Sequence, residues 1–373
     1  MSDYVSEELV VEILKRLPVK SLLKFRSVCK SWYSLITNPN FISLHLTHTT
    51  EANKPYLLIT KSFRPDDREC QRFVLHRDDA SFSEHKQLDL QFFYTVPSGS
   101  NPENYFSISG SCNGLVCLSD YKCNRLIVWN PAIGEYITTS KSKFDIVLGF
   151  GFDSKNNDYK IVKLADKGTA SPQELIQPDV KIFELSSNSW KSITVKNLRY
   201  SIFASPFRVY VNGFIHWFVR GNRHDRKITI ASFDLSNETF GEWMVPDALA
   251  ANDQLSNHNL SLIVYRRSLT IVHYEDFKGI EYRKCSFWVM KEYGAPECWT
   301  KHFTINLQGY DLLLVHNIQG NGELLVEEGN HEMAFYDPET QRVTRLGCHG
   351  YIRRVHSYTE SLVLLKGRKQ KQQ

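Results

Sequence analysis

Apolar residues near the start of the chain recur at the spacing of short amphipathic helices. Leu9, Ile13 and Leu17 follow one another every four residues, which places them on one face of a helix. Ser6 offers a side-chain acceptor to the first turn, and Pro18 ends the helix. Further apolar groups up to about residue 46 repeat this pattern. The sequence therefore predicts a helical module of three short helices, with one further helical turn, over residues 6–46.

This module has more apolar side chains than a few short helices could bury among themselves. A segment of about 40 residues buries too little surface to be comfortably stable alone, and it shows neither a disulfide pattern nor a metal motif. The surplus predicts a protein partner for the helices. A helical cap on the rest of the chain is the alternative. A membrane-surface helix is disfavoured, because the cations are not gathered opposite the bulky apolar residues.

Beyond about residue 50, apolar residues recur at every second position, as they do in β-strands. Five similar units each contain a strand led by an aromatic residue, then a tight polar turn and another strand. The leading aromatics are separated by 54, 50, 54 and 48 residues, and they are Trp129, Phe183, Phe233, Phe287 and Phe335. This spacing indicates a repeat of about 50 residues.

Upstream of each leading aromatic, a tight turn precedes another apolar strand. Asn-Gly pairs at 113–114, 212–213 and 321–322 suit the left-handed dihedrals of hairpin turns, and Asn157-Asp158 and Arg267-Ser268 occupy equivalent places. Four strands in about 50 residues are typical of a kelch-like propeller blade. A degenerate first unit raises the prediction to about six blades, with a terminal strand at 361–365 pairing into the first blade. A β-sandwich would not explain the period.

The predicted fold class is therefore α plus all-β, a helical module followed by a kelch-like β-propeller. The expected boundaries are 1–48 for the helices, 49–366 for the propeller and 367–373 for a basic tail.

Charge and cysteine content point to a protein inside the cell. Lys plus Arg total 45 and Asp plus Glu total 41, and both signs are scattered, so no nucleic-acid-binding stripe is expected. No apolar run reaches the ~20 residues that span a bilayer, so no membrane is expected as a partner. The start of the chain does not resemble a secretory signal, and the eight cysteines form no CxxC pair. The expected location is the cytoplasm, with the nucleus as a second candidate.

Catalytic and metal-binding patterns are absent from the sequence. There is no HExxH, GxSxG, phosphate-binding GxxxxGK[ST] or GxGxxG motif. Cys117 and His216 lie inside apolar strands, where a buried structural role is expected. Glu327 and Glu328 are adjacent in a strand and would point to opposite faces, which argues against shared acid–base chemistry. No catalytic residue, cofactor or metal is expected.

Several motifs together carry a family resemblance. The segment VSEELVVEILKRLPVKSLLKFRSVCKSWYSLITNPNF (residues 5–41) resembles an F-box. The rest resembles the F-box-associated interaction domain of plant F-box proteins, through GSCNGLVCL (110–118), WNPAIGE (129–135), GFGFDSKNNDYKIVKL (149–164) and FWVMKEYG (287–294). Within that group the pattern is most similar to S-locus F-box and S-locus F-box-like proteins.

The resemblance implies a substrate receptor of a Skp–cullin–F-box ubiquitin ligase. The F-box would bind a Skp-type adaptor and through it a cullin, and the second domain would capture a target protein. Lys20, Lys24 and Lys30 would form a polar rim around the adaptor contact. The adaptor-binding residues that the resemblance implies are Leu9, Ile13, Leu14, Leu17, Pro18, Leu22, Leu23, Val28, Cys29, Trp32, Leu35 and Ile36.

One departure from the family keeps other functions open. F-boxes commonly begin with Leu-Pro, whereas Val5-Ser6 stands in that place here. A scaffold or decoy that binds without promoting turnover is therefore one alternative. A propeller enzyme of the kelch-type oxidase or carbohydrate-active kind is another, although fold alone says little about function.

Target recognition is expected to belong to the propeller loops, because loops vary while strands hold position. The resemblance to S-locus proteins suggests a ribonuclease of the self-incompatibility system as one target, and turnover of other proteins stays equally open. The candidate loops are residues 61–72, 94–104, 165–179, 219–227, 246–260 and 275–284.

Overall fold

The computed structural model describes residues 6–52, 56–63, 70–88, 106–120, 125–139, 145–165, 179–194, 208–220, 227–250, 255, 259–275, 284–295, 298–306, 312–363 and 365. The chain forms two compact units. One comprises Met1–Ile59, Phe73–Lys141 and His356–Gln373, and the other comprises Thr60–Arg72 and Ser142–Val355. Within the described residues, no helix combines the length and apolar character needed to cross a membrane.

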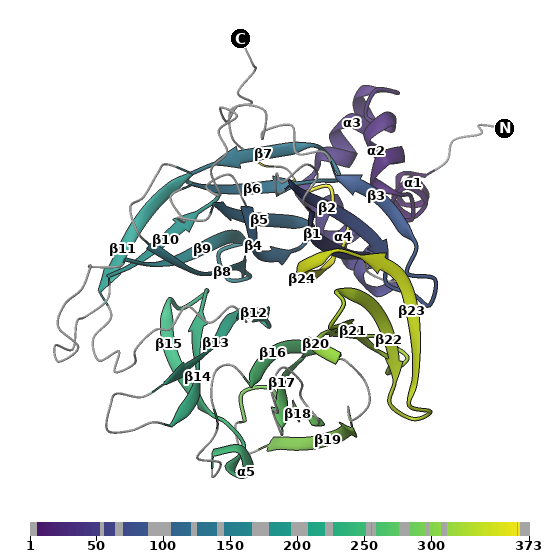
Figure 1. Ribbon diagram of the computed structural model, residues 1–373. Helices are drawn as coiled ribbons and strands as arrows, with labels where there is room; N and C mark the ends of the chain where they lie inside the picture. The colour runs from purple at the N-terminus through teal and green to yellow at the C-terminus, as the bar shows by residue number, and fades with distance from the viewer. Residues whose placement is uncertain are drawn as a thin grey trace. The chain divides into compact units, whose positions relative to one another are not determined.

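Four helices open the described chain (Figure 1). They are α1 (Glu7–Leu14), α2 (Val19–Phe25), α3 (Lys30–Thr37) and α4 (Pro39–Ala52). The Ser6 hydroxyl accepts a hydrogen bond from the Leu9 amide at 3.4 Å, which confirms the predicted N-cap. A fifth short helix, α5 (Asp247–Ala250), follows later in the chain.

The described strands form six sheets of four strands each, the number and size expected for the blades of a six-bladed β-propeller (Figure 1). The first sheet has the order β24-β1-β2-β3, with bounds Tyr351–Tyr358, Tyr56–Phe63, Cys70–Arg77 and Glu84–Leu88. The second contains β4 (Phe106–Cys112), β5 (Leu115–Asp120), β6 (Leu126–Asn130) and β7 (Glu135–Thr138). The third contains β8 (Asp145–Asp153), β9 (Asp158–Ala165), β10 (Asp179–Glu184) and β11 (Ser189–Thr194).

The other three sheets have the same sequential order. The fourth contains β12 (Arg208–Val211), β13 (Phe214–Arg220), β14 (Ile228–Asp234) and β15 (Thr239–Met244). The fifth contains β16 (Leu260–Tyr265), β17 (Ser268–Glu275), β18 (Lys284–Met290) and β19 (Trp299–Asn306). The sixth contains β20 (Leu312–Ile318), β21 (Leu324–Glu328), β22 (Glu332–Asp337) and β23 (Arg342–His349). These sheets confirm the predicted blade count.

The leading aromatics of the repeat occupy the third strand of five successive sheets, and all are at most 4% exposed. Each lies opposite a residue of the fourth strand. Phe233 faces Phe240 with ring centroids 4.9 Å apart, and Phe287 faces Phe303 at 4.4 Å. Such cross-strand aromatic pairs stabilise a blade, which explains why the period is visible in the sequence.

The predicted hairpin turns all join the first strand of a sheet to the second. Asn113, Asn157 and Asn212 have φ of 52°, in the left-handed region that Asn and Gly tolerate best. Arg266 and Arg267 adopt φ of 48° and 64°, so the turn in the fifth sheet carries strain that Asn-Gly avoids.

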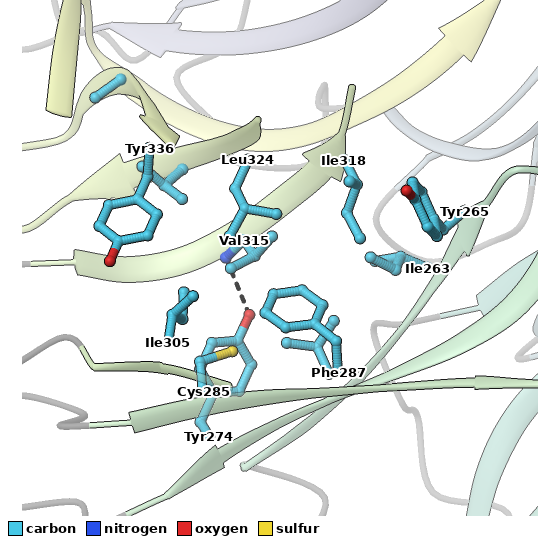
Figure 2. Close-up of a cluster of buried hydrophobic side chains, with 13 residues drawn as sticks. Ile263, Tyr265, Tyr274, Cys285, Phe287, Ile305, Val315, Ile318, Leu324 and Tyr336 are labelled. Carbon is cyan, nitrogen blue, oxygen red and sulfur yellow. Dashed lines mark hydrogen bonds between the residues drawn. The ribbon is translucent and has the colours of Figure 1, made fainter. Parts of the chain in front are cut away.

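The cores of neighbouring sheets merge within the second unit. Figure 2 shows one such cluster, which joins the fifth and sixth sheets. The Tyr274 hydroxyl accepts a hydrogen bond from the Val315 amide at 3.0 Å, and Phe287 and Leu324 are fully buried nearby. A buried polar group thus has a partner inside an apolar cluster.

The C-terminal strand differs from the prediction. The strand that joins the first sheet is β24, beside β1, whereas the described residues 361–363 and 365 belong to no strand. Residues 361–365 were expected to pair because SLVLL is a short apolar run. The run is apolar because it is buried outside the sheet, and Ser361 and Leu362 have no exposed surface.

Candidate functional site

Three aliphatic side chains of the helical module are more than half exposed. Leu9 and Ile13 lie one turn apart on α1 and are 57% and 55% exposed, and Val28, between α2 and α3, is 61% exposed. Such positions usually carry polar residues on a helix that faces only solvent. Their exposure makes this module the strongest candidate in the described chain for a protein-interaction surface.

Three of the twelve predicted contact residues are instead interior residues of the module. Leu14, Leu22 and Ile36 are at most 1% exposed and pack with Phe41 in one core cluster. A partner cannot reach these side chains in this structure. Helical periodicity identifies apolar faces, but it does not distinguish a face packed on neighbouring helices from one offered to a partner.

The remaining predicted residues are accessible in part or in full. Pro18 and Cys29 are exposed, and the half-buried members are Leu17, Leu23, Trp32 and Leu35. Cys29 caps α3, because its sulfur accepts a hydrogen bond from the Trp32 amide at 3.4 Å. The Trp32 ring meets Phe25 edge-on at 5.4 Å, which fixes its orientation.

Sequence reasoning missed two exposed apolar residues of this module. Tyr33 on α3 is 56% exposed, and Leu44 on α4 is 39% exposed. A signal was available, because both are large apolar residues of the segment whose apolar surplus predicts a partner. Neither was expected to contact a partner.

The same helical module carries exposed charged residues. Lys20, Lys24 and Lys30 are all exposed, as a polar rim requires. Glu12 lies 2.6 Å from Lys15 and 3.4 Å from Arg16, and its hydrogen bond with Lys15 lowers the pKa of the Glu12 carboxyl. These pairs are partly exposed, so they orient side chains more than they stabilise the helix.

The candidate target-recognition loops lie largely outside the described residues, but the strands that flank them are described. Four of the loops connect the second strand of a sheet to the third: residues 61–72, 165–179, 219–227 and 275–284. The other two, 94–104 and 246–260, connect a fourth strand to the next sheet. Because neighbouring strands are antiparallel, both kinds of connection leave a sheet at the end opposite its first-to-second-strand turn.

The polar residues that were assigned structural roles are buried, as expected. His216 and Cys117 have no exposed surface. Glu327 accepts hydrogen bonds from His316 at 2.9 Å and His331 at 2.7 Å, whereas the adjacent Glu328 pairs with Arg345. Among the residues that the structure describes, no group of three His, Cys, Asp or Glu side chains is placed to hold a metal ion.

The histidine pair has a clear effect on Glu327. Burial alone would raise the pKa of this carboxyl, but the hydrogen bonds and charges of His316 and His331 outweigh burial and lower it. Glu327 therefore stays ionised and paired inside the sixth sheet, which is a structural arrangement.

Comparisons with known proteins agree with this arrangement of helices and sheets. Residues 71–365 match the model of the F-box associated beta propeller domain, and residues 5–44 match that of the F-box domain. F-box protein At3g07870 of Arabidopsis thaliana is 30% identical over 396 aligned positions, covering 93% of this chain and 88% of the relative.

Two further Arabidopsis thaliana relatives align over most of their length. F-box/kelch-repeat protein At3g23880 is 29% identical, with 80% of this chain and 78% of the relative covered. F-box protein CPR1 is 25% identical, with 91% and 83% covered.

Proposed function

The chain belongs to the F-box proteins that carry an F-box-associated β-propeller domain, and from this premise we propose that it is the substrate-recognition subunit of a Skp–cullin–F-box ubiquitin ligase. In this role the F-box binds a Skp-type adaptor, which connects it to a cullin. The propeller binds a target protein for ubiquitylation and degradation. Ubiquitin transfer takes place on a separate conjugating enzyme, so the chain is a non-catalytic receptor.

The exposure of Leu9, Ile13 and Val28 is the observation that carries the proposal. Covering a Val, Leu or Ile side chain stabilises a complex by roughly 1.5–3 kcal/mol relative to leaving it in water. Interfaces concentrate binding energy in a few such anchors, with charged residues at the rim. The nine accessible members of the predicted set, together with Tyr33 and Leu44, form the proposed adaptor surface.

The topology of the sheets supports target binding at the end of each blade that lies opposite the first-to-second-strand turn. The first-to-second-strand turns are short, whereas the connections at the opposite end include all six candidate loops. Helix α4 leads into β1 at the end of the first sheet that carries the short turns. Target binding by the loops would therefore leave the F-box end of that sheet free for the adaptor.

Adaptor binding can be tested with matched surface substitutions. Ile13→Asp places a charge in the proposed interface, and Met244→Asp, at a side chain 46% exposed in the fourth sheet, is the control. Co-purification with Skp-type adaptors should be lost for Ile13→Asp and retained for Met244→Asp. Equal adaptor retention by both variants, or no binding by the unaltered chain, would refute the proposal.

The S-locus resemblance makes a ribonuclease of the self-incompatibility system the first target to test. Reconstituted ubiquitylation then separates the receptor from a scaffold or decoy: a receptor promotes ubiquitin chains on the bound ribonuclease, whereas a decoy binds it without modification. We propose the cytoplasm as the place of action, with the nucleus as the second compartment for fractionation to examine.

A further inference from the structure

The hydrophobic core of the F-box is completed by residues from outside the F-box. Leu362, near the C-terminus, has no exposed surface and belongs to the same buried cluster as Leu14, Leu22 and Ile36. Ala132 and Ile133, in the turn between β6 and β7, pack against this cluster as well. The four helices therefore do not close their own core. They share it with the C-terminus and the second sheet.

A buried asparagine holds the C-terminal segment in place. The Asn130 side-chain amide donates hydrogen bonds to the carbonyl oxygens of Ser361 and Val363, at 3.1 and 2.9 Å. The side-chain oxygen of Asn130, Oδ1, accepts a hydrogen bond from the Ala132 amide at 3.0 Å. Asn130 has no exposed surface, so these bonds form where water does not compete for them. One side chain thus fixes both segments that complete the F-box core.

The neighbouring turn of the second sheet is shaped to admit this segment. Gly114 has φ of +78°, and a Cβ atom there would meet the Ser361 hydroxyl and lie 2.7 Å from the Thr359 carbonyl oxygen. Beyond the segment, the Leu365 amide donates to Glu135 Oε2 at 3.2 Å. We call residues 359–363 the C-terminal strap. The strap lies against two turns of the second sheet and places Leu362 in the F-box core.

The size of the F-box makes this contribution important. A module of about 40 residues buries too little apolar surface to be stable without help. Among the residues that the structure describes, the F-box has no disulfide or metal cluster to supply that help. Leu362 of the strap and the β6–β7 turn both pack on the core cluster of the F-box, and they add apolar surface that the helices lack.

We propose that the C-terminal strap is required for adaptor binding, with Leu362 and Asn130 as positioning residues that hold the F-box helices in their binding arrangement. This inference rests on the proposed function, because it takes the Skp-type adaptor as the ligand. Neither residue touches the adaptor. They act through the F-box helices, whose exposed side chains do.

The test compares Leu362→Ala with Leu324→Ala in the full-length chain. Both leucines are completely buried, but Leu324 lies in the core between the fifth and sixth sheets. We expect Leu362→Ala to weaken binding to a purified Skp-type adaptor by about tenfold or more, because truncating a buried leucine opens a marginal core. Leu324→Ala should change adaptor affinity less than about twofold, and Leu362→Met, which conserves volume, should retain binding.

Hydrogen exchange provides a readout that does not depend on the adaptor. Amides of α1–α3 should exchange about tenfold faster in Leu362→Ala and in Asn130→Ala, while amides of β16–β23 keep their protection. If the unaltered chain binds no adaptor, the proposed function fails but this exchange pattern still tests the strap. Native adaptor affinity and native protection of α1–α3 in both variants would overturn the inference. Asn130→Ala serves as the deciding variant if Leu362→Ala does not fold.

Discussion

Lys160 and Asp153 form an ion pair at 2.7 Å in the third sheet, with side chains that are 2% and 0% exposed. The Lys160 ammonium group also lies 2.7 Å from Glu238 and donates to the Leu235 carbonyl oxygen at 2.8 Å. It therefore connects the third sheet to the turn between β14 and β15. Burial would raise the pKa of Asp153, but hydrogen bonds from Lys160, Asn156 and Ser236 outweigh it and lower that pKa.

Removing Lys160 should be far more costly than removing a neighbouring exposed lysine. In Lys160→Ala, Asp153 and Glu238 lose their buried cation, and breaking such a pair typically costs about 3–5 kcal/mol. Lys191 also pairs with Glu238, at 2.6 Å, but its side chain is 40% exposed, so Lys191→Ala should cost about 1 kcal/mol or less. Urea unfolding of both variants measures the difference. Equal losses would show that the buried pair adds nothing beyond a surface pair.

Two glycines in equivalent turns separate backbone strain from strap contact. Gly114 and Gly213 have φ of +78° and +86°, so alanine at either position costs about 1–2 kcal/mol in the left-handed region. A Cβ at Gly213 has nothing within 4 Å, whereas one at Gly114 collides with Ser361 and Thr359. Gly114→Ala should therefore lower the unfolding free energy by about 1–3 kcal/mol more than Gly213→Ala. Equal losses of unfolding free energy in the two variants would mean that the strap moves away from the added methyl group at little cost.

Much of the propeller could be predicted because its signals are local. Leading aromatics such as Phe233 recur because each packs on the fourth strand of its own sheet, and Asn-Gly turns recur because hairpins need left-handed dihedrals. The role of residues 361–365 could not be predicted in this way. Asn130 and Ser361 are 231 residues apart in sequence, and nothing local to SLVLL distinguishes a strand from a segment buried under helices.

The candidate site was predictable as a region but not residue by residue. An apolar surplus in a short helical module indicates a partner, and the exposure of Leu9, Ile13 and Val28 agrees with that interpretation. The burial of Leu14, Leu22 and Ile36 could not be seen in the periodicity, because the F-box core is built partly from Leu362 and the β6–β7 turn. Which apolar face is covered depends on contacts distant in sequence.

His216 should make the protein sensitive to mild acid. Its Nε2 lies 2.7 Å from the Tyr293 hydroxyl, which itself donates to the Val211 carbonyl oxygen, so Nε2 is the protonated nitrogen of a neutral ring. Burial lowers the pKa of His216 to about 3. A histidine in the unfolded chain has a pKa of about 6.5. As the pH falls from that value toward 3, His216 therefore binds a proton in the unfolded state but not in the folded state.

Stability attributable to His216 is therefore present above about pH 6.5 and decreases below it. Between pH 7 and pH 5 the unaltered chain should lose about 2 kcal/mol more unfolding free energy than His216→Gln, which cannot titrate. Denaturant unfolding at the two pH values gives this difference directly, and groups such as Glu327 cancel because both proteins contain them. The same pH dependence in both proteins would assign the acid sensitivity to other residues.

Thiol reactivity can map the adaptor surface without any substitution. Cys29 is exposed on the F-box, whereas Cys117 and Cys285 are fully buried, and burial raises the pKa of the Cys285 thiol. Maleimide labelling followed by peptide mass spectrometry should therefore modify Cys29 well before either buried thiol. A bound Skp-type adaptor should slow labelling of Cys29 and leave the half-buried Cys298, in the second compact unit, at its original rate. An unchanged Cys29 rate in the complex would place the adaptor elsewhere on the F-box and remove Cys29 and Val28 from the proposed contact set.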